Sequence, residues 1–311
     1  DGAKAVTLIK VITGSDFEGD VENINNHSKL AKLFAMSGFE KLPVLGEDKH
    51  GSVDPSVNEL NLAPTSYVDA AKEMAAVPHI WDQTYSNFIT GLGEHLKRAL
   101  GYVKENPNDH FTRLASVQGK NMSVASAISR MDAEKQRLEE AGGLDTPLHY
   151  SYRFSAMLRM QIDSTGLNPH RDKLHRHIAP PKAVHTTFDP NKDAGTLKEK
   201  FFLAAIGQGM GFKSDQNSLA WIADKVAEWA MANGEVLGAA IRILQGQTNQ
   251  ADQQLVADAA IELGEEAASL KAIMNLAQLT SASQTKQPFA TSLTYEIDGL
   301  ANGPSVSVAQ Y

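Results

Sequence analysis

The sequence predicts a mainly α protein with a small β component, of the α+β class. Helical periodicity of apolar residues dominates from residue 65 onward, strand-like alternation is confined to the two ends of the chain, and no internal repeat is present. At 311 residues the chain is long enough for two or three substructures with a sizeable core. We expect three regions, which span residues 1–80, 81–145 and 146–311.

Composition excludes several classes of protein and of site. The net charge of −8 argues against an overall basic nucleic-acid coat protein. The absence of cysteine excludes disulfides, thiolate zinc sites and cysteine nucleophiles. No apolar run approaches the roughly 18 residues of a membrane span. The start "DGAKAVTLIK" has neither an initiator Met nor the pattern of a signal peptide, so we expect a piece of a longer protein.

Strand and loop are expected first, and helices after them. The opening "KAVTLIKVI" resembles a strand, and a region rich in Gly, Pro and Asp follows as far as residue 64. A helix then begins with Thr65 or Ser66 as its N-cap candidate. Next, "WDQTYSNFITGLGEHLKRALGYVKE" and "SVASAISRMDAEKQRLEEAGG" predict two long amphipathic helices, the second running from Ser123 to a stop at Gly142. We expect these two helices to form a hairpin-like arm.

Four more helices and a strand are expected after residue 200. The helical segments are "LKEKFFLAAIGQGM", "LAWIADKVAEWAMANG", "EVLGAAIRILQG" and "DQQLVADAAIELGEEAASLKAIMNLAQL". In the strand, Leu293, Tyr295 and Ile297 alternate with polar residues and lead into Asp298-Gly299. Asp-Gly is the commonest tight-turn dipeptide, so a structural turn and a functional carboxylate are both open readings of this strand end.

A basic segment separates the two helical blocks. The stretch "HYSYRFSAMLRMQIDSTGLNPHRDKLHRHIAPPK" has two acidic residues and six basic ones, with Tyr150, Tyr152 and Phe154 between them. The basic residues are Arg153, Arg159, Arg171, Lys173, Arg176 and Lys182. This composition is typical of a surface that follows a phosphate backbone and stacks on bases. A solvated charged face is the alternative.

Three other kinds of site are disfavoured by spacing. His170, His175 and His177 lack the carboxylate or cysteine that would complete a zinc site. The glycines of "AIGQGMGFKS" follow a helix, whereas those of a phosphate loop follow a strand, so we expect a helix end there. No Gly-x-Ser-x-Gly motif supports a serine hydrolase.

The basic segment and the terminal strand together resemble the single-subunit, phage-type DNA-dependent RNA polymerases, most closely the virion-packaged polymerases of schitoviruses. In the first motif of that family, Ser155 takes the place of Thr or Asp, Leu158 that of Gly and Arg159 that of Arg, with Asn168-Pro169 following. The second motif, Asp-Gly-x-x-Asn-Gly-Pro, is matched in full by Asp298, Gly299, Asn302, Gly303 and Pro304. The resemblance runs from about residue 80 to the end of the chain.

The resemblance implies an incomplete right-hand polymerase, made of the thumb and the first part of the palm. Asp298 would be the catalytic carboxylate and would bind Mg²⁺ together with the carbonyl of Gly299. The nucleic acid would be bound by Ser155, Arg159, Arg171, Lys173, Arg176 and Lys182. Leu158 replaces a glycine that allows close approach to nucleic acid, so the local contact is expected to differ.

The implied function is part of a DNA-dependent RNA polymerase that adds NTPs to an RNA 3′ end by two-metal chemistry. The family's second metal-binding Asp and its catalytic Lys and Tyr lie beyond the end of this chain, so we expect the chain alone to be inactive. Expected partners are template DNA, the RNA–DNA hybrid, NTPs, the remaining palm and fingers, and other virion or ejection proteins. The expected location is the capsid interior, then the host cytoplasm after injection. The alternative is a virion structural or DNA-ejection protein with a non-catalytic polymerase remnant.

Overall fold

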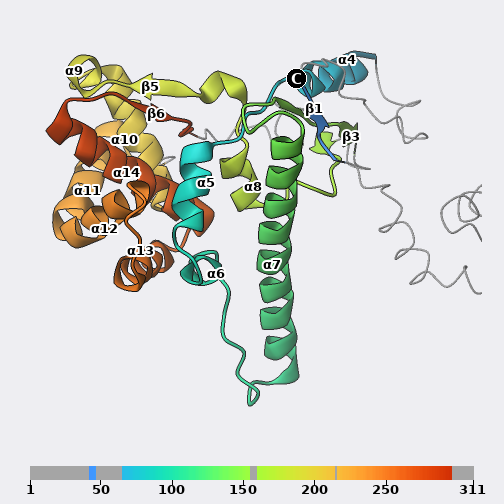
Figure 1. Ribbon diagram of the computed structural model, residues 1–311, viewed down its shortest axis with the longest axis horizontal. Helices are drawn as coiled ribbons and strands as arrows, with labels where there is room; N and C mark the ends of the chain where they lie inside the picture. Colours follow the sequence, from blue (N-terminus) through green and yellow to red (C-terminus); the bar gives the residue numbers. More distant parts are fainter. Residues whose placement is uncertain (1–41, 47–64, 155–159, 214–215, 296–311) are drawn as a thin grey trace, which may run out of the picture.

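The computed structural model describes residues 42–46, 65–154, 160–213 and 216–295 (Figure 1). Most of them are helical and the strands are short, which confirms a mainly α fold with a small β component. The helices of this part are α4 (Thr65–Ala75), α5 (Gln83–Thr90), α6 (His95–Ala99), α7 (Phe111–Glu140), α8 (Lys173–Ile178), η2 (Lys182–Val184), α9 (Pro190–Asp193), α10 (Leu197–Gly209), α11 (Leu219–Ala232), α12 (Gly234–Leu244), α13 (Gln250–Leu263) and α14 (Ala267–Thr285). The strands are β1 (Val44–Leu45), β2 (Leu148–His149), β3 (Tyr152–Phe154), β4 (Met160–Ile162), β5 (Thr186–Phe188) and β6 (Phe289–Thr291).

Helix α14 lies at the centre of the C-terminal helical cluster. Its first eleven residues, "AASLKAIMNLA", are mostly small or apolar, and all of them except Ala268 are buried. A helix that is apolar around most of its circumference is stable only when other elements cover it. Helices α10, α12 and α13 provide most of that cover, while α5 and α8 contact α14 from the middle of the chain (Figure 1).

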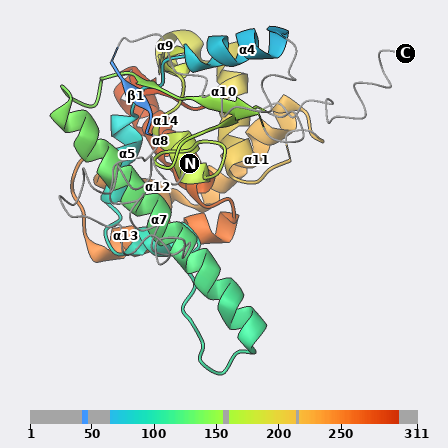
Figure 2. The ribbon, with the colours of Figure 1, turned by 90° about the vertical axis from the view of Figure 1, so that its right-hand side faces the viewer.

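Helix α7 forms a long arm, about 45 Å at 1.5 Å per residue for its 30 residues. Its buried side chains are spaced three or four residues apart and therefore share one side of the helix. They are Asn121, Val124, Ala127, Met131, Glu134 and Leu138. The first ten residues of α7 are all at least partly exposed, and this end projects from the rest of the molecule in both views (Figures 1 and 2).

The predicted hairpin of two long helices is wrong. The first helix is broken into α5 and α6 around Gly91 and Gly93. A Cβ on Gly91 would lie 2.8 Å from Ile243 Cγ2, and Gly93 has a φ of +54°, which disfavours other residues. The second helix starts earlier than Ser123, at Phe111. The arm is therefore a single helix, although it ends close to the predicted stop at Gly142.

The last predicted helix is also divided in two. Gly264 adopts a left-handed conformation with a φ of +83° and ends α13, and α14 then starts at Ala267. The prediction of a helix end among the glycines after α10 is confirmed, because α10 ends at Gly209. Gly207 also lets α11 pack closely, since a Cβ there would lie 2.2 Å from Ile222 Cγ2.

The strands within the described residues form three antiparallel two-stranded ribbons, β1–β2, β3–β4 and β5–β6. In the last of these, Thr186 pairs with Thr291 and Phe188 with Phe289. The C-terminal strand thus lies four residues earlier than predicted, and residues 292–295 are not in a strand. Ile297 and the opening strand "KAVTLIKVI" lie outside the described residues. No helix in the part of the chain described here is both long and apolar enough to span a membrane.

Candidate nucleic-acid interface

Asn168 organises the loop that leads from β4 into the basic helix α8. Its buried Nδ2 donates to the carbonyls of Ile162 and Ser164, at 3.1 Å each. Its Oδ1 accepts hydrogen bonds from the backbone N–H groups of His170 and Arg171. One amide side chain therefore satisfies four backbone groups, which fixes the loop without regular secondary structure.

His170 ties this loop to the ribbon β3–β4. Its Nδ1 accepts a hydrogen bond from the backbone N–H of Ile162 at 3.1 Å, and its ring packs edge-on against Tyr152. Strands β3 and β4 flank residues 155–159, which include Ser155 and Arg159. These two predicted contacts, and Leu158, lie outside the described residues.

Helix α8 is held against the arm by His175. Its Nδ1 accepts from the Asn168 N–H at 3.1 Å, and its Nε2 donates to the Ala127 carbonyl of α7 at 2.9 Å. Burial lowers the pKa of His175, so the ring is neutral and both nitrogens are used. The Asp172 carboxylate caps the helix by accepting from the Leu174 N–H. The buried face of α8 is thereby fixed, and its basic side chains point outward.

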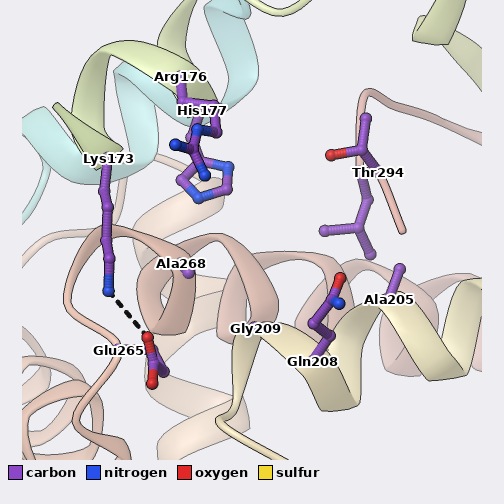
Figure 3. Close-up of a pocket in the computed structure, with 10 residues that line it drawn as sticks. Lys173, Arg176, His177, Ala205, Gln208, Gly209, Glu265, Ala268 and Thr294 are labelled. Carbon is purple, nitrogen blue, oxygen red and sulfur yellow. Dashed lines mark hydrogen bonds and ion pairs between the residues drawn. The ribbon is translucent and has the colours of Figure 1, made fainter. Parts of the chain in front are cut away.

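A pocket of about 150 Å³ lies beside this outer face (Figure 3). Lys173, Arg176 and His177 line one side, and α10 and the start of α14 line another. Leu293 and Thr294, from the segment after β6, complete it. The structure therefore brings the basic helix next to a segment more than 110 residues later in the chain.

The three basic side chains that line this pocket differ in their partners and in their charge. Lys173 Nζ lies 2.9 Å from Glu265 Oε2, and both side chains are nearly half exposed (Figure 3). The Nε of Arg176 donates to the carbonyl of Pro169 at 3.3 Å. Burial, followed by the positive charges of Lys271, Arg176 and Lys173, lowers the pKa of His177 to about 3. His177 is thus neutral at physiological pH, and the lysine and the arginine supply the positive charge.

A buried ion pair fixes the segment after β6 to the protein. Lys271 of α14 binds the carboxylate of Asp82, which caps α5, and both side chains are almost fully buried. Ser292 accepts from Lys271 Nζ at 2.8 Å and donates to the same Asp82 carboxylate, 210 residues away in sequence. The Lys271 ammonium also lies 4.7 Å from the centre of the Tyr85 ring. Three distant segments therefore meet at one enclosed charge cluster.

Burial and the partner charge act in opposite directions on the pKa values of Asp82 and Lys271. Burial alone would raise the pKa of Asp82, but the charge of Lys271 and the hydrogen bonds from Lys271, Ser292 and the Tyr85 N–H lower it below its usual value. Burial lowers the pKa of Lys271, and the Asp82 carboxylate opposes that shift. The pair compensates two charges that would each be costly to bury alone.

The remaining predicted site residues are divided between the surface and the undescribed parts of the chain. Arg171 and Lys182 are exposed, and their side chains make no ion pair with a described residue. Lys182 is held through its backbone N–H, which donates to the Pro78 carbonyl at 2.7 Å. Asp298 and Gly299 lie outside the described residues. Within the described residues, no group of three or more His, Asp or Glu side chains is arranged to hold a metal ion.

Sequence reasoning missed Lys271, Asp82 and Ser292. A signal for Lys271 was present, because a lysine inside the apolar run "AASLKAIMNLA" needs a buried counter-charge. Nothing in the pattern identified Asp82 as that partner, since the two residues are 189 positions apart.

Part of the chain matches a known protein family. Residues 66–179 match the family model "Virion DNA-directed RNA polymerase domain". The match supports the resemblance to virion RNA polymerases and a polymerase-related role in a phage virion. It includes Arg159 and helix α8, starts earlier than the expected residue 80, and does not include Lys182 or Asp298. No curated protein matches the chain significantly.

Proposed function

We propose that this chain is part of a DNA-dependent RNA polymerase that is carried in a phage virion and enters the host cytoplasm with the DNA. Residues 81–145 act as the thumb and 146–311 as a palm segment, with 1–80 preceding them. The reaction joins the RNA 3′ oxygen to the α-phosphate of an NTP and releases pyrophosphate. The remaining palm and fingers, template DNA and the RNA–DNA hybrid are its partners.

The observation that carries this proposal is the pocket shared by α8 and the segment after β6. Lys173 and Arg176 line it from one side and Thr294 from another. Asp298 follows Thr294 by four positions, and four residues of chain reach at most about 14 Å. Asp298, the carboxylate proposed to act in catalysis, is therefore tethered within about 14 Å of one wall of this basic pocket.

Each proposed residue has a chemical role. Asp298 and the Gly299 carbonyl are oxygen ligands of the kind that Mg²⁺ prefers. When bound, Mg²⁺ lowers the pKa of the RNA 3′ hydroxyl and neutralises charge on the leaving pyrophosphate. Ser155 and Arg159 contact the hybrid, where the planar guanidinium suits phosphates and 2′ hydroxyls. The exposed cations contact the backbone and position it without reading sequence. They are Arg171, Lys173, Arg176 and Lys182.

A second candidate is a virion structural or DNA-ejection protein that retains a non-catalytic polymerase segment. Leu158 at the usual glycine position favours it, as does the end of the family match at residue 179. The two candidates differ in whether Asp298 supports metal-dependent chemistry.

The test is Asp298→Asn in an active polymerase that contains these residues. Loss of one metal ligand should slow primer extension by several orders of magnitude, about 10³-fold or more, with little change in affinity for nucleic acid. Asp224→Asn, a change of the same kind at an exposed position on α11, is the control and should leave extension unchanged. If the Asp298 variant extends the primer at near the parental rate, Asp298 has only a structural role in a turn, and the second candidate is favoured.

A further inference from the structure

A second cavity, of about 200 Å³, lies between the arm and helix α8. Lys120, Ser123 and Val124 of α7 line one side, and Arg171 and Lys173 line another. The arm thus contributes a lysine to the same basic face as α8. No feature of the sequence pattern predicted Lys120 as part of this face.

Two consecutive glutamates at the start of α14 pair with the lysines of this face. Lys120 Nζ lies 3.1 Å from Glu266 Oε1, and Lys173 Nζ lies 2.9 Å from Glu265 Oε2. All four side chains remain between 37% and 49% exposed. Pairs as exposed as these contribute little to stability, so either lysine can exchange its partner.

The backbone leaves room for one of these pairs. Gly101 has a φ of +90°, and a Cβ built on it would lie 2.7 Å from Glu266 Oε1 and 2.8 Å from Lys120 Nζ. The positive φ disfavours a residue with a side chain at this position. The Lys120–Glu266 pair lies directly beside Gly101, and its two side-chain ends are flexible and partly exposed.

Acidic side chains offset most of the charge of the basic face. Lys120, Arg171, Lys173 and Arg176 carry four positive charges, and Glu265, Glu266 and the helix-capping Asp172 carry three negative ones. Arg171 has no ionic partner among the described residues. The face therefore has a net charge of only about +1 in the free protein, although it holds four cations that suit phosphate.

We propose that Lys120, Arg171 and Lys173 bind backbone phosphates of the nucleic acid, and that Glu265 and Glu266 compete with those phosphates for the two lysines. This inference rests on the proposed function, because it takes nucleic acid as the ligand. A lysine suits such an exchange because its ammonium is a point charge on a flexible stem and needs no fixed partner geometry. The carboxylates would weaken binding to any phosphate that cannot reach both lysines.

The test is the affinity of the full chain for a fluorescein-labelled RNA–DNA hybrid, measured by fluorescence anisotropy at several salt concentrations. Glu265→Gln/Glu266→Gln should tighten binding by about fivefold at low salt, because two competing carboxylates are lost. The control Glu139→Gln/Glu235→Gln removes the same charge from exposed residues that line neither cavity, and should change affinity less than about twofold. Damage to the fold does not produce tighter binding.

Coupling between variants tests whether the effect passes through Lys120. Lys120→Gln should weaken binding, and Glu266→Gln should then no longer tighten it. If Glu265→Gln/Glu266→Gln binds no more tightly than the control, while wild-type binding still weakens steeply with salt, competition by the carboxylates is overturned and the proposed function stands. If neither wild type nor any variant shows salt-dependent binding, both proposals are overturned.

Discussion

Two kinds of ion pair, one buried and one exposed, lie in or just before helix α14. Lys271, in the middle of the helix, binds Asp82 where water is excluded. Glu265 and Glu266, just before the helix starts, bind Lys173 and Lys120 at the surface. The buried pair and Ser292 fix three distant segments in one arrangement, because separating the two charges would leave each of them buried without its counter-charge. The exposed pairs are weaker, because water and counter-ions compete for the same groups, and the proposed exchange with phosphate depends on this.

The difference assigns separate roles to charges that look alike in the sequence. The buried cluster determines where the segment after β6 lies, through Ser292. The exposed pairs determine how strongly positive the neighbouring basic face is. We therefore expect the position of this segment and the proposed nucleic-acid binding to respond to different mutations.

The largest expected effect is on stability, from breaking the buried pair. Lys271→Met should lower the free energy of unfolding by about 3–5 kcal/mol, because Asp82 is left as an uncompensated buried charge. Lys271→Met/Asp82→Asn should recover much of the loss, since asparagine can still cap α5. Urea unfolding measures both.

Lys173→Met is the matched control, because it breaks an exposed pair of the same type. It should cost less than about 1 kcal/mol. An equal loss of stability in Lys173→Met and Lys271→Met would remove the distinction between the two kinds of pair.

A smaller effect on stability is expected from a change of pH. It acts through His177, which feels the charges of both the buried Lys271 and the exposed Lys173. Its pKa is lowered to about 3 in the folded protein, against an ordinary value near 6.5, so the unfolded chain takes up a proton below pH 6.5 that the folded protein does not. The free energy of unfolding should therefore fall with decreasing pH, with a contribution from His177 of about 1.4 kcal/mol per pH unit.

His177→Gln should remove that contribution, so its stability should depend less steeply on pH between 6 and 4. Urea unfolding at several pH values gives both slopes. Identical slopes for wild type and variant would mean that His177 is protonated in the folded protein, and would add a positive charge to the pocket.

Much of the fold could be predicted from the sequence, because its helices are amphipathic or apolar over long stretches. The glycines after α10 were correctly predicted as a helix end. Glycine inside a helical pattern was harder to interpret, since Gly91 and Gly264 interrupt helices where apolar periodicity continues on both sides. Periodicity reports which residues face the core, and it does not report a change in helix direction.

The basic residues of the candidate nucleic-acid interface could be predicted from the sequence, but their acidic partners could not. The basic residues of α8 are close together in sequence, so their charge pattern is visible. The pairing of Lys173 with Glu265 depends on a residue 92 positions away and on the path of the chain. The roles of Arg159 and Asp298 stay predictions, because both residues lie outside the part of the chain that the structure describes.

The most direct test of the central claim, that the face formed by α8 and the arm binds nucleic acid, is protection of lysines from acetylation. With an RNA–DNA hybrid bound, mass spectrometry should show slower modification of Lys120, Lys173 and Lys182. Lys225 is the control, because it is a similarly exposed lysine paired with Glu228 on α11. Slower modification of the first three with no change at Lys225 is the predicted result. Protection of Lys225 without protection of Lys120 and Lys173 would contradict it.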